Sequence, residues 1–227
     1  MRRLLNRFSL LPVPLKILLS FAVVILSGSL VLALPFSQLE SSNATYFDHL
    51  FTAVSMVCVT GLFTEPLADT YNLFGQIIGL VLIKLGGLGL ITIVATIVMQ
   101  LGHRVSMKDE VTLQQALNRG DMVNFRNFLL SVVKYTFVIE GIGAFFLTFY
   151  FVPLFGWAKG LFTSIFLSIS AFNNAGFDNL GSTSLQAFVD SPIVNTVIPL
   201  LIIVGGIGFS VWSDEHQKHN DCLAAFR

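Results

Sequence analysis

Two short segments of the sequence have residue types that could bind a cation stripped of its water. They read CVTG at positions 58–61 and NNAG at positions 173–176, and each follows a short apolar stretch. A cation that loses its hydration shell inside a membrane needs oxygen ligands in exchange, and the backbone carbonyls of an extended loop can supply them. Such a loop favours a glycine, which adopts dihedral angles that other residues avoid. The candidate filter residues are Cys58, Val59, Thr60, Gly61, Asn173, Asn174, Ala175 and Gly176.

The two segments belong to a duplicated stretch of sequence. FTAVSMVCVTGL at positions 51–62 aligns with FLSISAFNNAGF at positions 166–177, at a shift of 115 residues. Further along, KLGGLGL at 84–90 corresponds to VGGIGF at 204–209. A duplicated unit is the expected organisation of a pore lined by equivalent elements. The coinciding pairs around the two segments are Phe51 with Phe166, Ser55 with Ser170 and Gly61 with Gly176.

The elements that must position these segments are predicted to be helices in a membrane. A bilayer core about 30 Å thick needs about 20 apolar residues in a helix. Two shorter apolar stretches, at 44–57 and 157–172, suit helices that dip into the membrane and return. The carboxyl end of each would direct a partial negative charge at the ion. The stretches long enough to span are 15–36, 71–101, 128–152 and 192–212.

The predicted fold class is therefore an all-α membrane protein of two repeats. Each repeat consists of a transmembrane helix, a re-entrant pore helix with its filter loop, and a second transmembrane helix. The expected regions are a first repeat at 1–101, a cytoplasmic linker at 102–126, a second repeat at 127–212 and a polar tail at 213–227. Asp190 and Ser191 are predicted to cap the fourth span, with Pro192 in its first turn.

Composition supports the membrane class and excludes others. Hydrophobic residues make up 54% of the chain and charged residues 11%, whereas soluble domains carry about 25% charged residues. A net charge of zero argues against nucleic acid as a partner. Cys58 and Cys222 lie in different contexts, which argues against a structural disulfide. Residues 1–34 could be a signal peptide, but the lack of a small-residue cleavage site favours a retained first helix.

The distribution of basic residues predicts the orientation in the plasma membrane. The segments expected outside have Lys159 as their basic residue and are rich in acids, which would concentrate cations at the outer mouth. The N-terminus and the 102–126 linker are therefore predicted to be cytoplasmic in a multi-pass protein, with both short helices entering from outside. The basic residues on the cytoplasmic side are Arg2, Arg3, Arg7, Lys16, Arg104, Lys108, Arg119 and Arg126.

These motifs resemble the pore loops of the Trk/Ktr/HKT potassium-uptake family, most closely the KtrB/TrkH membrane subunits. The similarity covers SMVCVTGL at 55–62, SAFNNAGFD at 170–178 and the glycine runs that follow them. It implies a four-repeat pore with one filter glycine from each repeat, of which Gly61 and Gly176 would be the first two. It also implies potassium as the transported ion, sodium as a coupling ion, homodimers, and a cytoplasmic ring of nucleotide-binding regulatory subunits.

Two repeats would supply only half of such a pore. A second copy, or a missing C-terminal half, would then be needed to complete the ring around the ion. The polar sequence SDEHQKHNDCLAAFR after position 212 predicts a truncated chain or a change of reading frame. No cofactor is predicted, and lipid is the expected surrounding of the helices.

Two charged residues fall near the middle of predicted spans, namely Lys84 and Glu140. Charges at this depth are costly, so the two are predicted to pair; alternatively, Lys84 lies near the ion path as an electrostatic barrier. The glycine runs would allow close helix packing or act as hinges. These glycines are Gly86, Gly87, Gly89, Gly205, Gly206 and Gly208.

Several alternatives remain open from the sequence. Each filter glycine could instead end a helix as its cap. Thr60 could offer its hydroxyl to the ion or cap the short helix, whereas Cys58 is expected to contribute its carbonyl rather than bind a metal. The chain could also be a non-conducting assembly subunit or a membrane-embedded enzyme. An enzyme is disfavoured because no phosphate loop, nucleophile elbow or zinc motif is present.

Overall fold

The computed structural model describes residues 13–89 and 125–207, and these residues form helices and loops without a strand. The all-α prediction is therefore confirmed for this part of the chain. Some side chains near the starts of the helices at 13–32 and 125–155 are not described. The elements are α2 (Val13–Leu32), η1 (Pro35–Ser37), α3 (Tyr46–Val57), α4 (Leu67–Thr70), α5 (Leu73–Gly87), α8 (Phe125–Phe155), α9 (Trp157–Phe172), η2 (Ser184–Phe188) and α10 (Pro192–Gly206).

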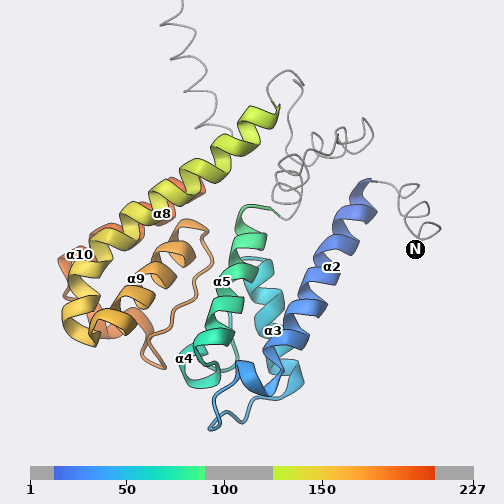
Figure 1. Cartoon of the computed structure of the whole chain (residues 1–227), viewed down its shortest axis with the longest axis horizontal. Helices are drawn as coiled ribbons and strands as arrows, with labels where there is room; N and C mark the ends of the chain where they lie inside the picture. Colours follow the sequence, from blue (N-terminus) through green and yellow to red (C-terminus); the bar gives the residue numbers. More distant parts are fainter. Residues whose placement is uncertain (1–12, 90–124, 208–227) are drawn as a thin grey trace, which may run out of the picture.

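The first half consists of α2, α3 and α5, which pack side by side (Figure 1). After α3 the chain turns back to the end from which α3 started. Leu39, which precedes α3, donates its N–H to the carbonyl of Thr70, which follows it, at 3.0 Å. Below this contact, His49 and Tyr71 are both buried and share a hydrogen bond of 2.8 Å. The short helix α3 is thus held between two longer helices.

The second half repeats this arrangement with α8, α9 and α10 (Figure 1). After α9 the chain again returns to the end from which that helix started. The ring of Phe188 in η2 meets the rings of Phe151 and Phe155 at the end of α8, with centroids 5.4 Å and 6.3 Å apart. In both halves, therefore, the helix that precedes the loop, α3 or α9, packs against the other two main helices of its half.

Local sequence signals account for the helix starts. Thr45 and Asp48 form a capping box at the start of α3, in which the Thr45 N–H donates to the Asp48 carboxylate at 2.8 Å. The Asn72 side chain accepts from the N–H of Gly75 at 3.1 Å and so starts α5. The Ser191 side chain caps α10, which begins at Pro192 as the sequence predicted.

The predicted helix bounds hold with small shifts. Helix α9 matches the prediction, α3 begins two residues later than position 44, and α8 extends beyond the predicted span 128–152 at both ends. Helix α2 ends at Leu32 rather than at position 36, because Leu34 precedes a proline and is extended. The predicted ends of the second and fourth spans, most of the linker, and the tail at 213–227 lie outside the described residues.

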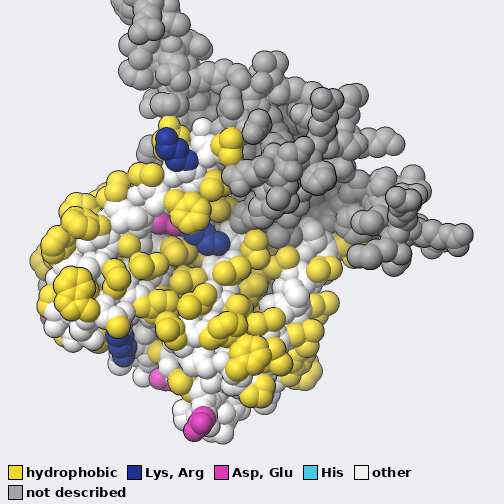
Figure 2. All heavy atoms as spheres, viewed as in Figure 1, with side chains coloured by type: hydrophobic (Ala, Val, Ile, Leu, Met, Phe, Trp, Pro, Cys, Tyr) yellow, Lys and Arg dark blue, Asp and Glu magenta, His cyan; other side chains and the backbone are white. Residues whose placement is uncertain are grey.

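The surface of the described helices suits an apolar environment. Residues 130–155 of α8 are long and apolar enough to cross a membrane, and 18–32, 73–87, 157–172 and 192–206 are shorter apolar helices. Hydrophobic side chains cover much of the face shown in Figure 2, and charged ones are sparse there. Large apolar side chains are exposed on every one of these helices. This surface is consistent with a membrane protein.

Candidate cation-binding site

The short helix α3 ends in a left-handed turn. Cys58 is the C-cap, and Val59 after it has φ 54°. The N–H of Thr60 reaches back to the carbonyl of Ser55 at 2.8 Å, and the N–H of Val59 reaches that of Met56 at 3.3 Å. These two bonds define a Schellman motif, in which the residue after the cap is left-handed and is usually a glycine.

The short helix α9 ends in the same way. Asn173 is the C-cap, Asn174 has φ 56°, and the N–H of Ala175 donates to the carbonyl of Ser170 at 2.8 Å. The left-handed residues of the two motifs are thus a valine and an asparagine. The alternative in which Gly61 and Gly176 cap the helices is wrong, because both glycines lie two residues further along the chain.

The two glycines adopt a second left-handed conformation and bring the loops together. Their φ angles are 77° at Gly61 and 71° at Gly176. A Cβ added to Gly61 would lie 2.8 Å from the carbonyl oxygen of Ala175, and one added to Gly176 would lie 3.3 Å from the Cα of Gly61. The loops from the two halves therefore touch through backbone atoms, at a separation that only glycine permits at position 61.

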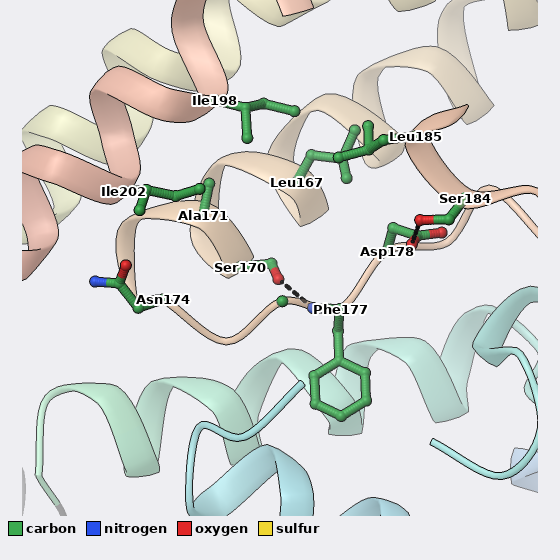
Figure 3. Close-up of a pocket in the computed structure, with 11 residues that line it drawn as sticks. Leu167, Ser170, Ala171, Asn174, Phe177, Asp178, Ser184, Leu185, Ile198 and Ile202 are labelled. Atoms are coloured by element: carbon green, nitrogen blue, oxygen red, sulfur yellow. Dashed lines mark hydrogen bonds between the residues drawn. The ribbon is translucent and has the colours of Figure 1, made fainter. Parts of the chain in front are cut away.

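A buried serine holds each loop from inside, a role that the sequence analysis missed. The Oγ of Ser55 accepts from the N–H of Leu62 at 2.8 Å, and the Oγ of Ser170 accepts from the N–H of Phe177 at 2.9 Å (Figure 3). Both serines are almost completely buried. Their coincidence in the duplicated stretch was the available signal, since a polar residue repeated at one place on two apolar helices needs a partner.

The hydrogen bonds of both loops leave the carbonyl oxygens unused. In the described parts of the chain, the N–H groups of the first three residues of each loop donate back to the preceding helix, and those of Leu62 and Phe177 donate to the buried serines. No carbonyl of 58–61 or 173–176 accepts a hydrogen bond there. The side chains of these segments carry no charge. The arrangement offers uncharged oxygen atoms on two touching loops, which is the ligand type that alkali cations prefer.

A cavity of about 180 Å³ lies beside the second loop (Figure 3). Its walls combine aliphatic side chains of α9, η2 and α10 with residues of the second loop and the segment that follows it. Asp178 at its edge is engaged in a turn, because its carboxylate accepts from the N–H of Leu180 at 2.9 Å and from the hydroxyl of Ser184 at 2.5 Å. In Figure 3 the Phe177 ring points away from the cavity, and it lies 6.3 Å from the ring of Phe63 in the first half.

The predicted pairing of Lys84 with Glu140 is present. Lys84 of α5 donates to Oε2 of Glu140 of α8, and its Nζ lies 4.6 Å from the centroid of the Phe137 ring. Glu140 is 4% exposed. Its other oxygen, Oε1, accepts from Nδ2 of Asn173 at 2.9 Å. The pair therefore joins the two halves and reaches the start of the second loop.

The glycine runs lie where helices approach each other. A Cβ on Gly86 would overlap the carbonyl oxygen of Val57, and one on Gly205 would overlap that of Phe172. These two carbonyls belong to the last residues of α3 and α9, so each run lets the helix after the loop pack on the end of the helix before it. Of the other predicted glycines, Gly87 lies against the Asn173 side chain, Gly206 lies near Asn174, Gly89 has φ 77°, and Gly208 is outside the described residues.

Nothing in the described segments forms a conventional metal site, since no three His, Cys, Asp or Glu side chains gather there. Cys58 is exposed and its thiol is free, and Cys222 lies outside the described residues. Thr60 is exposed, and no hydrogen bond from its hydroxyl to α3 is found among the described residues.

Comparison with known proteins gives consistent matches. The TrkH family, described as cation transport protein, matches residues 16–217. The potassium/sodium uptake protein NtpJ of Enterococcus hirae is 41% identical over 199 residues, which cover 88% of this chain and 44% of the relative. The Ktr system potassium uptake protein B of Vibrio alginolyticus and that of Bacillus subtilis are each 39% identical over 201 residues, again covering 88% and 44%. The chain thus spans less than half the length of these curated relatives.

Proposed function

Because the chain belongs to the TrkH family of cation transport proteins, we propose that it forms half of a potassium-conducting pore. The carbonyl oxygens of 58–61 and 173–176 coordinate the ion in this proposal. The family and its relatives are transporters rather than enzymes. The observation that carries the proposal is the repetition of one left-handed loop, with unused carbonyl oxygens, in two halves that touch at Gly61 and Gly176.

The physical basis of the proposed selectivity is the replacement of water by backbone oxygens. The first three N–H groups of each loop are bonded to the ends of α3 and α9, and the N–H after each loop is bonded to a buried serine, so each backbone is held while its carbonyls remain available. The carboxyl ends of α3 and α9 add partial negative charge next to the loops. Two loops give half a coordination shell, and a second copy or a separate C-terminal half supplies the remainder.

The names of the relatives suggest a coupling ion and a regulatory partner. Two relatives are named as parts of a Ktr system, and one is named for potassium and sodium. We therefore include sodium as a coupling ion and a cytoplasmic nucleotide-binding subunit as a regulator in the proposal. Both assignments concern the complete assembly rather than the half described here.

The proposed arrangement in the plasma membrane has the N-terminus and residues 102–126 in the cytoplasm. Helices α3 and α9 are then re-entrant from the outer side, and residues 178–189 lie outside. Single-cysteine variants at Ser106 and Ser182, made without the native cysteines, test this orientation. We expect an impermeant thiol reagent added to intact cells to label Ser182→Cys and to spare Ser106→Cys. The reverse pattern would refute the orientation.

The function is tested by complementation of bacteria that lack potassium uptake. The chain is expressed alone, and with the part of the Vibrio alginolyticus relative that lies outside its matched region. Growth at low potassium, normalised to the amount of chain in the membrane, is the readout. We expect the combination to restore growth and the Gly61→Ser combination to fail. Growth with the chain alone would identify a second copy as the other half.

A well-expressed combination that restores no growth at any potassium concentration would count against a pore and favour a non-conducting assembly subunit. The Vibrio alginolyticus part expressed without this chain is the control. Growth with that part alone would remove this chain from the conducting path.

A further inference from the structure

We propose that Glu140 is a positioning residue for the second loop: paired with Lys84, it fixes Asn173 and so sets the ion preference contributed by residues 173–176. This inference rests on the proposed pore function for its effect on ions. Its structural part, the fixing of one loop and not the other, concerns the described residues alone and can be tested separately.

The amide of Asn173 is held by two acceptors. Its Nδ2 donates to Oε1 of Glu140 at 2.9 Å and to the carbonyl of Ile169 at 2.7 Å. Because both neighbours are acceptors, the amide can satisfy them only with its nitrogen directed toward them. Asn173 is the C-cap of α9 and is 7% exposed. The side chain therefore ties the last turn of α9, at the point where the loop begins, to the neighbouring helix α8.

Three further contacts hold Glu140 and Asn173 in place, of which one is made to the Glu140 carboxylate itself. Lys84 bonds Oε2 from the other half of the molecule. The hydroxyl of Ser168 in α9 donates to the backbone carbonyl of Glu140 at 2.7 Å, so α8 and α9 are joined at the same level by both main chain and side chain. Gly87 lets α5 approach so closely that a Cβ there would overlap the amide oxygen of Asn173.

A charged pair suits this task better than a neutral acceptor. A carboxylate accepts a stronger hydrogen bond than an amide oxygen, and Lys84 cancels its charge so that no net charge stands beside the loop. A lone carboxylate in the same place would be costly to bury and would alter the potential near the carbonyls. Lys84 and Glu140 together therefore hold Asn173 firmly and change the electrostatic potential at the loop carbonyls little.

The first loop has no counterpart of this anchor among the described residues. The position that corresponds to Asn173 is Cys58, an exposed free cysteine. The two loops share the left-handed turn and the serine bond, so the anchor is the feature that separates them. Variants at position 173 should consequently act on the second loop and leave the first unchanged.

The structural test uses the purified full chain with a spin label in one loop at a time. The reporters are Asn174→Cys in the second loop and Thr60→Cys in the first, both at exposed positions, in a Cys58→Ser, Cys222→Ser background. Asn173→Asp sets two carboxylates against each other, and Asn173→Ala removes the donor without adding charge. We expect either change to increase label mobility at position 174 and to leave position 60 unchanged.

The rescue variant exchanges donor and acceptor. Asn173→Asp combined with Glu140→Gln lets the glutamine amide donate to the new carboxylate and keeps the total charge, so label mobility at 174 should return to that of the unmodified chain. Unchanged mobility in Asn173→Asp and Asn173→Ala, equal changes at positions 60 and 174, or a double variant no better than the single one would overturn the proposal.

The transport test uses the complemented cells. We expect Asn173→Asp to lower the preference for potassium over sodium about tenfold, the scale of one lost charge-assisted hydrogen bond, and the double variant to recover most of it. If the labels respond as expected and the ion preference does not, the anchor would be structural only and this proposal fails. If no combination conducts, the pore function fails while the label experiment still decides the anchor.

Discussion

The loops at 58–61 and 173–176 have nearly the same backbone and different surroundings. In each loop the helix cap is followed by a left-handed residue and then by a left-handed glycine, and a serine of the preceding helix accepts from the N–H after that glycine. The first loop begins with an exposed cysteine. The second begins with a buried asparagine tied to an ion pair. The backbone is set by the few residues that the repeats share, and the support around it has diverged between them.

The largest expected effect comes from breaking the support of the second loop. Lys84→Met or Glu140→Gln alone should lower the free energy of unfolding by about 3–5 kcal/mol, because either change leaves a buried group without its partner. The double variant should lose less than the sum of the two. Unfolding of the detergent-solubilised chain followed by circular dichroism gives the coupling energy. Additive losses would mean that the two residues act independently, and Lys84 would then become a candidate for a charge on the ion path.

The next comparison is between the two glycines. A side chain in the left-handed region costs about 1–2 kcal/mol, and at Gly61 its Cβ would also press on the carbonyl of Ala175 in the other loop. A Cβ at Gly176 would lie 3.3 Å from the Cα of Gly61, which is closer than an ordinary contact but less severe than the 2.8 Å at Gly61. We expect Gly61→Ser to reduce the preference for potassium over sodium by about tenfold or more, and Gly176→Ser to reduce it less. Ion competition in the complemented cells measures both, and equal losses would mean that torsional strain outweighs the contact between loops.

Removing the two serine hydroxyls should have smaller effects than the glycine changes, and here the larger effect is expected in the second loop. Ser170→Ala leaves the buried N–H of Phe177 without an acceptor, which costs about 1–3 kcal/mol. Ser55→Ala leaves the N–H of Leu62, an exposed residue that water can reach. The second loop should therefore lose more stability than the first. Thermal unfolding of the two variants measures the difference, with Ser182→Ala as a control that removes an exposed hydroxyl outside both loops.

Much of the fold could be predicted because its signals are local. The short helix α9 begins and ends at the predicted residues, and the cap at Ser191 with Pro192 fixes the start of α10. The first helix ended earlier than predicted because apolar residues continue past the point where Pro35 stops it. A prediction from apolar composition alone does not locate the residue at which a proline ends the helix.

The site was predictable in its backbone and not in its side-chain contacts. The repeated glycines pointed to both loops, and both have positive φ. Charge and depth pointed to the pairing of Lys84 with Glu140. The bond from Asn173 to Glu140 joins residues 33 apart on different helices. Nothing in the local pattern of either residue specifies that contact, because it depends on how α8 and α9 pack.

The smallest expected effect concerns the left-handed residue after each helix cap. Asparagine adopts this conformation more readily than a β-branched residue, for which it is an outlier. The first loop nevertheless has Val59 there, and its side chain is half-buried against the apolar cluster of the first half. Asn174 is exposed and has no such packing. We therefore expect Asn174→Val to lower the free energy of unfolding by about 1–2 kcal/mol, because the strain is added without compensating contacts.

Asn174→Gly is the matched control, since glycine is unstrained there, and it should change stability by about 0.5 kcal/mol or less. Thermal unfolding of the two variants, measured side by side, separates backbone strain from loss of the amide. Equal stability of Asn174→Val and the unmodified chain would mean that the second loop tolerates valine without packing. The burial of Val59 would then not explain why a β-branched residue stands in the first loop, and the likeness of the two turns would have to rest on their hydrogen bonds alone.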